Sequence, residues 1–220
     1  YYFRNQLVLD LSNPRVQDFV FCIVDSLMIK NSGLAYIKWD CNAVIYNANS
    51  LYLKDQAKLY IAYVEGLYRV LARIKAKYPR LPMMLCSGGG GRVDYGALAF
   101  FTEYWPSDNT DPLERIFIQW ANSYFYPAIA SVNHVTNWGK QPLKFKIDVA
   151  MMGKLGFDIP LHELKENDLD FCKAAVKTYN QINPIIFHGQ QYRLQNPWDN
   201  DVASIMYVDS LKMKAIVMSY

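Results

Sequence analysis

The chain has 220 residues, of which 52% are hydrophobic and 20% are charged, a balance typical of a globular protein and not of a disordered one. Its formal net charge is +3, without long runs of like charge, which argues against an extended nucleic-acid or membrane surface. The longest apolar runs, such as residues 19–24, are far shorter than the roughly 20 residues of a membrane helix. We therefore expect neither a nucleic acid nor a membrane as a partner.

Strand and helix patterns alternate along most of the chain. Strand-like runs lie at residues 6–11, 34–39, 82–87, 102–107, 129–135 and 156–159. Apolar residues at three-and-four spacing predict helices over residues 15–30 and 55–78, the first starting at Pro14 and the second stopping before Pro79. The alternation indicates βαβ units and a parallel sheet.

The pattern changes after about residue 183. Residues 185–194 and 202–220 read as strands joined by short turns, which predicts an antiparallel element. We divide the chain into residues 1–183, part of a (β/α)8 barrel, and residues 184–220, the start of an antiparallel β domain. Because both ends fall in strand-like runs, we infer a piece of a longer protein that holds roughly strands 3 to 8 of the barrel. The alternative, an open doubly wound sheet, normally carries a phosphate-binding glycine fingerprint, and none occurs.

Polar residues gather where the predicted strands end, which is where parallel α/β proteins carry functional side chains. In "KWDCN", the residues Lys38, Asp40 and Asn42 occupy alternate positions, so an extended backbone points them to one side. On this triplet alone, a surface turn with a chance Lys/Asp pair is the simpler interpretation.

The next two strands end in a similar way. In "CSGGGGR", Cys86 ends a strand, and the glycines that follow either let the backbone approach a ligand or form a flexible turn. In "SDNTDP", Asp111 precedes Pro112 and reads as a helix N-cap, whereas Asp108 has no such structural explanation.

Two carboxylates at the ends of different strands are what a retaining glycosidase needs. One attacks the anomeric carbon and the other protonates the leaving oxygen, at about 5 to 5.5 Å separation. Asp40 and Asp108 are the candidates, and Lys38 would keep Asp40 ionised.

Three stretches, "YIKWDCN", "CSGGGGRVDYG" and "WPSDNTDPLERIFIQW", resemble in order and spacing the family 36 glycoside hydrolases, α-galactosidases with a (β/α)8 barrel. The resemblance implies that Asp40 is the nucleophile and Asp108 the acid/base. It also implies five galactose contacts, namely Arg4, Lys38, Asn42, Cys86 and Gly89. The chain departs from the family at Ala43, where arginine is usual, and over residues 121–139, so the resemblance does not define the outer sugar subsites.

The expected activity is hydrolysis of terminal α-linked galactose from oligosaccharides through a covalent galactosyl-aspartate. Galactosyl transfer between sugars uses the same two carboxylates and stays open, and a non-catalytic sugar-binding domain would be expected to lack one of them. The scattered His134, His162 and His188 predict no metal site, and no cofactor is expected. We expect a cytoplasmic, homo-oligomeric parent protein.

Overall fold

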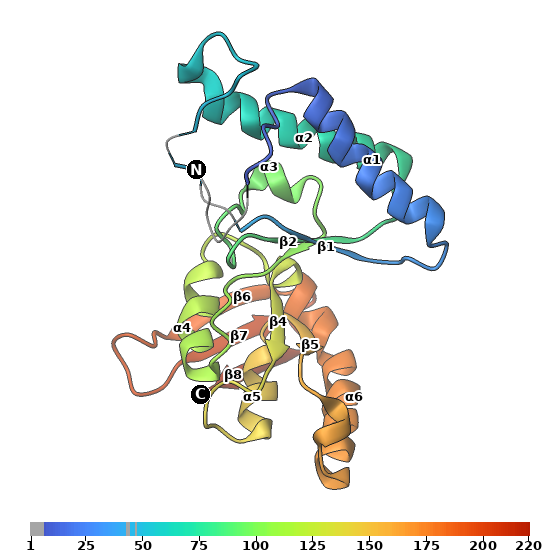
Figure 1. Cartoon of the computed structure of the whole chain (residues 1–220). Coiled ribbons are helices and arrows are strands. Elements are labelled where there is room, and N and C mark those ends of the chain that lie inside the picture. Colours follow the sequence, from blue (N-terminus) through green and yellow to red (C-terminus); the bar gives the residue numbers. More distant parts are fainter. Residues whose placement is uncertain (1–6, 43–44, 47) are drawn as a thin grey trace. The chain divides into compact units, whose positions relative to one another are not determined.

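The computed structural model describes residues 7–42, 45–46 and 48–220, which form two compact units, Tyr1–Thr102 and Glu103–Tyr220 (Figure 1). The first unit contains α1 (Pro14–Lys30), β1 (Ile37–Asp40), the 3-10 turn η1 (Gln56–Lys58), α2 (Leu59–Lys77), β2 (Met83–Cys86) and α3 (Tyr95–Leu98). The two long helices and the strands after them agree with the amphipathic patterns.

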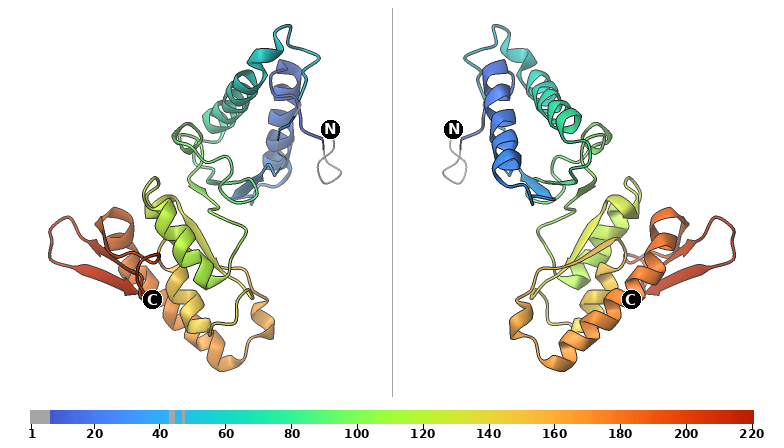
Figure 2. Two further views of the ribbon diagram at one scale, coloured as in Figure 1. Left: turned by 90° about the vertical axis from the view of Figure 1, so that its left-hand side faces the viewer. Right: turned by 90° about the vertical axis from the view of Figure 1, so that its right-hand side faces the viewer.

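Helices α1 and α2 lie side by side in the first unit (Figures 1 and 2). The α1 helix starts where Asn13 caps it and Pro14 occupies its first position. Two ion pairs join the helices at their exposed edge, Arg73 with Asp18 at 2.8 Å and Lys77 with Asp25 at 2.5 Å. Such exposed pairs contribute little, so the buried stripes between the helices supply most of the stability.

The chain before α1 is not a strand. Residues 7–10 have no regular structure and Leu11 starts a turn, so the strand predicted at 6–11 is wrong for the residues the structure describes. A strand needs a neighbour for its backbone groups, and no described segment pairs with this one. Instead, the Leu11 carbonyl accepts a hydrogen bond of 2.8 Å from the Gln17 side-chain amide.

The second unit contains β3 (Glu103–Tyr104), α4 (Pro112–Asn122), η2 (Ala128–Ala130), β4 (Val132–Val135), α5 (Leu143–Ala150), β5 (Lys154–Phe157) and η3 (Leu161–Glu163). It continues with α6 (Glu166–His188), β6 (Gln190–Gln195), β7 (Ser204–Val208) and β8 (Ala215–Ser219). Strands β4 and β5 pair in parallel, and β6, β7 and β8 form an antiparallel sheet in that order. The predicted change from parallel to antiparallel pairing is therefore present.

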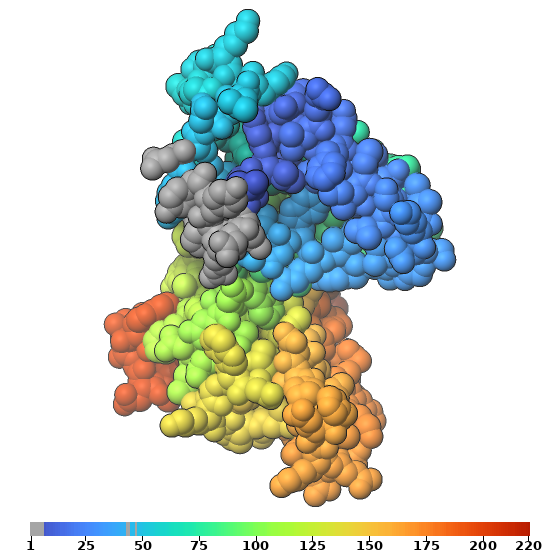
Figure 3. All heavy atoms as spheres, in the orientation of Figure 1, coloured from blue at the N-terminus to red at the C-terminus, as the bar shows by residue number. Residues whose placement is uncertain are grey.

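Helix α6 is longer than the sequence pattern indicates. It runs to His188 through an internal Pro184, so the strand predicted to begin at Ile185 is wrong over residues 185–188. Burial decides this, because the stripe that includes Tyr179 and Ile186 packs into the core although β-branched residues favour strands. Many other residues of α6 are exposed on the surface of the second unit (orange in Figure 3).

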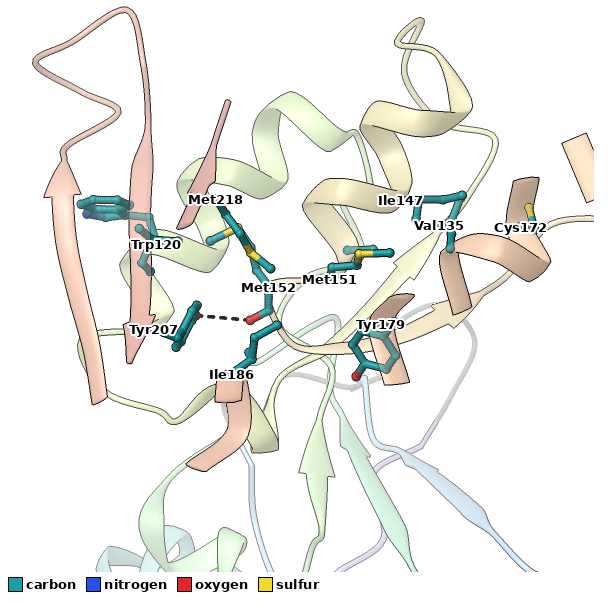
Figure 4. Packing of buried hydrophobic residues seen from close by; sticks show 13 residues of the cluster. Trp120, Val135, Ile147, Met151, Met152, Cys172, Tyr179, Ile186, Tyr207 and Met218 are labelled. Carbon is teal, nitrogen blue, oxygen red and sulfur yellow. Dashed lines mark hydrogen bonds between the residues drawn. The ribbon is translucent and has the colours of Figure 1, made fainter. Parts of the chain in front are cut away.

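One hydrophobic cluster joins the helices of the second unit to its antiparallel sheet (Figure 4). Its members come from α4 to α6 and from β4, β7 and β8, and the largest include Trp120, Ile147, Tyr179, Ile186 and Tyr207. The domain boundary placed between residues 183 and 184 falls inside α6 and stays a prediction.

Replacing Gly66 by alanine tests how closely α2 approaches the segment before α1. A Cβ atom on Gly66 would lie 1.8 Å from the Leu11 carbonyl oxygen, so backbone must move. We expect the free energy of unfolding to fall by about 1–3 kcal/mol, the usual cost of overpacking. Thermal and urea unfolding of the full-length protein measure this loss.

Gly33→Ala is the matched control, because nothing lies within 4 Å of a Cβ atom at Gly33. Its stability should stay within about 0.5 kcal/mol of the parent protein. Equal effects of the two substitutions would contradict the close approach at Gly66.

Candidate active site

The candidate site in the first unit begins where β1 and β2 end. The two strands pair in parallel, with Asp40 opposite Cys86. Burial alternates along β1, so Lys38 and Asp40 are exposed while Trp39 is half-buried and meets the ring of Phe101 edge-on at 6.4 Å between centroids. This alternation places the lysine and the aspartate on the same face of the strand.

The glycine turn after β2 is fastened to the end of β1. The backbone N–H of Gly88 donates to the Asn42 side-chain oxygen at 2.6 Å. Gly88 and Gly89 have φ angles of 55° and 88°, in the left-handed region that side chains disfavour. The glycines are therefore required by the turn itself, and Asn42 holds that turn against the strand that carries Asp40.

Arg92 holds the peptide between Cys41 and Asn42, just beyond the end of β1. Its Nε–H donates to the Cys41 carbonyl at 3.1 Å and to the Ser87 hydroxyl at 3.2 Å, while the Ser87 hydroxyl donates to the same carbonyl at 2.8 Å. The guanidinium also lies 5.5 Å from the centre of the Tyr63 ring on α2. Burial raises the pKa of the Cys41 thiol, which the positive charge of Arg92 opposes, so the thiol is neutral at pH 7.

A cavity of about 480 Å³ opens beside Asp40 within the first unit. Asp40, Asn42 and Arg92 contribute polar groups, and most of the other lining side chains are aliphatic or aromatic. This size and mixture are typical of a small-molecule site. Lys38 and Cys86 are not among the lining residues, and the Cys86 side chain is only 1% exposed.

In the second unit, internal hydrogen bonds stiffen the loop after β3. The Asp111 carboxylate caps α4 by accepting from the Leu113 N–H at 2.9 Å, as the sequence predicts. Asn109 accepts from the Asp111 N–H at 3.1 Å, and the hydroxyls of Thr110 and Thr136 lie 2.7 Å apart. Through Thr136 the loop is tied to the chain that follows β4.

Asp108 is exposed in this loop, and its Oδ1 accepts a hydrogen bond of 3.0 Å from the indole N–H of Trp105. Arg115 of α4 is buried beside it, with its guanidinium 5.0 Å from the centre of the Trp105 ring. Burial lowers the pKa of Arg115 to about 10, so it is still cationic at neutral pH. Asp108 is among the groups that favour its charged form.

The predicted site residues thus fall into two groups. Lys38, Asp40, Asn42, Cys86 and Gly89 come from the ends of β1 and β2, whereas Asp108 belongs to the second unit. The pairing of the Asp40 and Asp108 carboxylates stays a prediction. Arg4 lies outside the described residues, and the sugar contacts of the others stay predictions too.

Sequence reasoning missed Arg92, Trp105 and Arg115 as parts of these groups. Each stands inside one of the quoted motifs. Only Arg115 gives a sign in the sequence, because it lies at helical spacing from Pro112 and Gln119, on the stripe of α4 that is buried. Among the described residues, no three or more His, Cys, Asp or Glu side chains are arranged to hold a metal ion. No helix in that part of the chain is long and apolar enough to cross a membrane.

Arg92→Met tests whether this side chain fixes the end of β1. Removing a charged donor from the Cys41 carbonyl should cost about 1–2 kcal/mol and speed backbone hydrogen exchange around residues 38–42. Exchange mass spectrometry on the full-length protein measures this. Arg80→Met is the control, because Arg80 is exposed, and unchanged exchange in both variants would contradict the role of Arg92.

The fold and these groups define an α/β protein with carboxylates at the carboxyl ends of parallel strands, the edge at which parallel α/β folds carry functional side chains. A family model described as Melibiase matches residues 1–189. The chain belongs to the melibiase family.

Relatives named as α-galactosidases agree with this assignment. The chain is 36% identical, over 99% of its length, to α-galactosidase 1 of Pediococcus pentosaceus, and 33% identical, over 97%, to α-galactosidase AgaA of Geobacillus stearothermophilus. It covers only 31% and 30% of those two proteins, so it spans about a third of the curated relatives.

Solved structures match the chain equally well. The crystal structure of the GH36 α-galactosidase AgaA superposes with a TM-score of 0.94 at 33% identity, over 99% of this chain and 31% of that one. The α-galactosidase of Lactobacillus brevis gives 0.93 at 32%, over 99% and 30%. Both the α/β class and the resemblance to family 36, whose members have a (β/α)8 barrel, are confirmed.

Proposed function

We propose that the protein to which this chain belongs is a retaining α-galactosidase, with Asp40 as nucleophile and Asp108 as acid/base. The observation that carries the proposal is that Asp40 ends one parallel strand and Asp108 follows another, in a chain of the melibiase family. Strand β1 pairs with β2, and Tyr104 of β3 forms a parallel bridge to Ser131 before β4. In parallel α/β folds, this edge carries the chemistry.

The relatives support the substrate class. AgaA has been crystallised with raffinose and with stachyose, in each case as a variant in which one aspartate is replaced. Replacement of a different aspartate in each complex is what a mechanism with two essential carboxylates predicts. Those two aspartates lie about as far apart along the AgaA chain as Asp40 and Asp108 do here. We infer that terminal α-linked galactose on such oligosaccharides is the substrate.

The reaction would run in two steps. The Asp40 carboxylate forms a bond to the anomeric carbon while Asp108 gives its proton to the departing glycosidic oxygen. Asp108 then takes a proton from water, which displaces Asp40 and restores the starting configuration. The exposed face that Asp40 shares with Lys38 leaves this carboxylate open to a sugar.

We base the proposed sugar contacts and the proposed extent of the barrel on the resemblance to the same family. Arg4, Lys38, Asn42, Cys86 and Gly89 would bind galactose, and the chain would supply roughly strands 3 to 8 of the barrel and the first strands of a C-terminal β domain. The cytoplasmic location and the homo-oligomeric state are predictions of the same kind.

Product stereochemistry separates the roles of the two aspartates. In the full-length protein, Asp40→Ala should lower kcat by several orders of magnitude, because both steps need the nucleophile. Added azide would then attack once and give the inverted β-galactosyl azide. Asp108→Ala should still cleave substrates with good leaving groups, and azide should give the retained α product, because Asp40 has already inverted the centre once.

Nuclear magnetic resonance of the azide products identifies the anomer, with Asp111→Asn as a control that alters a capping carboxylate of the same loop. Near-normal activity of Asp40→Ala would overturn the proposed nucleophile. The same anomer from both rescued variants would overturn the assignment of roles.

A further inference from the structure

Trp105 is set against one oxygen of Asp108. Its indole N–H donates to Oδ1 at 3.0 Å, and no other hydrogen bond reaches this carboxylate from the described residues. Asp108 itself is exposed, whereas Trp105 is only 6% exposed. One oxygen of the carboxylate is therefore held by a buried group, and Oδ2 is left for whatever occupies the open side of the loop.

The indole is braced by its neighbours. The ring of His134 on β4 meets it edge-on, with centroids 4.8 Å apart, and the Arg115 guanidinium lies 5.0 Å from its centre. Arg115 is only 2% exposed and donates to the Val132 carbonyl at 3.2 Å and to the Ser107 carbonyl at 3.5 Å. Because the ring is packed on both partners, its N–H points in one fixed direction. The exposed Asp108 side chain lacks such packing, so the indole N–H fixes the orientation of its carboxylate.

The chemistry of the donor decides which oxygen carries the proton. An indole nitrogen is a hydrogen-bond donor only. When Asp108 is ionised, Oδ1 accepts from it, and when Asp108 is protonated, a proton on Oδ1 would compete with the indole N–H for the same oxygen. The favoured acid form has its proton on Oδ2, and Oδ1 keeps its bond to Trp105 in both states.

We propose that Trp105 is the positioning residue of the acid/base, confining the transferable proton of Asp108 to Oδ2 and fixing the direction in which it leaves. This inference rests on the proposed function, since it needs Asp108 to deliver a proton to a leaving group. A fixed direction for the Asp108 proton matters most when the leaving group is a sugar, because its oxygen is a poor leaving group and must be protonated as the bond breaks.

The test is Trp105→Phe in the full-length enzyme, which keeps an aromatic ring and removes the N–H. For raffinose, kcat/KM should fall about 10- to 100-fold, part of the usual contribution of general acid catalysis. For a dinitrophenyl α-galactoside, whose leaving group needs no proton, it should change by less than about threefold. If the phenylalanine variant does not fold, benzothienylalanine at this position, with sulfur in place of the N–H, keeps the shape of the ring.

Trp120→Phe is the matched control. Trp120 is also buried, at 2% exposure, and its indole nitrogen has no partner in the described part of the chain. Its replacement should affect the two substrates equally. An equal loss on both substrates in Trp105→Phe would show a structural role only and would overturn the inference.

A double-mutant cycle separates this inference from the function beneath it. In an Asp108→Ala background, Trp105→Phe should cost less than about twofold more on raffinose, because the two residues act as one unit. Independent, multiplying losses would overturn the positioning role while leaving the α-galactosidase intact. If the parent enzyme cleaves no α-galactoside, the proposed function fails and takes this inference with it.

Discussion

Parallel pairing of β1 with β2 brings Asp40 and Cys86 side by side, and the loops after both strands must share the small space beyond them. Every backbone polar group in that space needs a partner, because buried unpaired groups are costly. The chain meets this demand with a turn of left-handed glycines, the Asn42 side chain and the Arg92 guanidinium. Asn42 and Gly89, which the family resemblance assigns to sugar binding, therefore also help to hold the ends of β1 and β2 together.

The second unit depends on a buried positive charge. Removing Arg115 from water is expensive unless its donors are used, and carbonyls from the β3–α4 loop and from β4 use them. Since the same guanidinium packs on Trp105, one cation links the start of α4, strand β4 and the loop that carries Asp108. Glu103 on β3 forms a separate ion pair with Lys154 on β5, so a second pair of charged side chains joins two strands of this unit.

The hydrophobic cluster of the second unit has a consequence for how the chain is divided. The Tyr207 hydroxyl of β7 donates to the Met152 carbonyl at 3.4 Å, and Met218 of β8 packs in the same cluster as Ile147 of α5 (Figure 4). The antiparallel sheet and the helices before it therefore stabilise each other. Separating them would expose Ile186 and Ile205, which are almost completely buried.

Amphipathic spacing was enough to place α1 and α2, since a helix pairs its own backbone groups and needs only one apolar face. Strand-like runs placed Asp40 at the end of one strand and Asp108 after another, and Pro112 identified Asp111 as a cap, because these are properties of neighbouring residues. The strand predicted at residues 6–11 was wrong over residues 7–11, and the one predicted from Ile185 was wrong over residues 185–188. Strands depend on distant partners, and local β propensity yields to burial. Only the tertiary structure decided that Arg92 holds the Cys41 carbonyl and that His134 and Arg115 pack on Trp105. Such contacts depend on which loops pack together in space, and the spacing of residues along the chain does not show which loops those are.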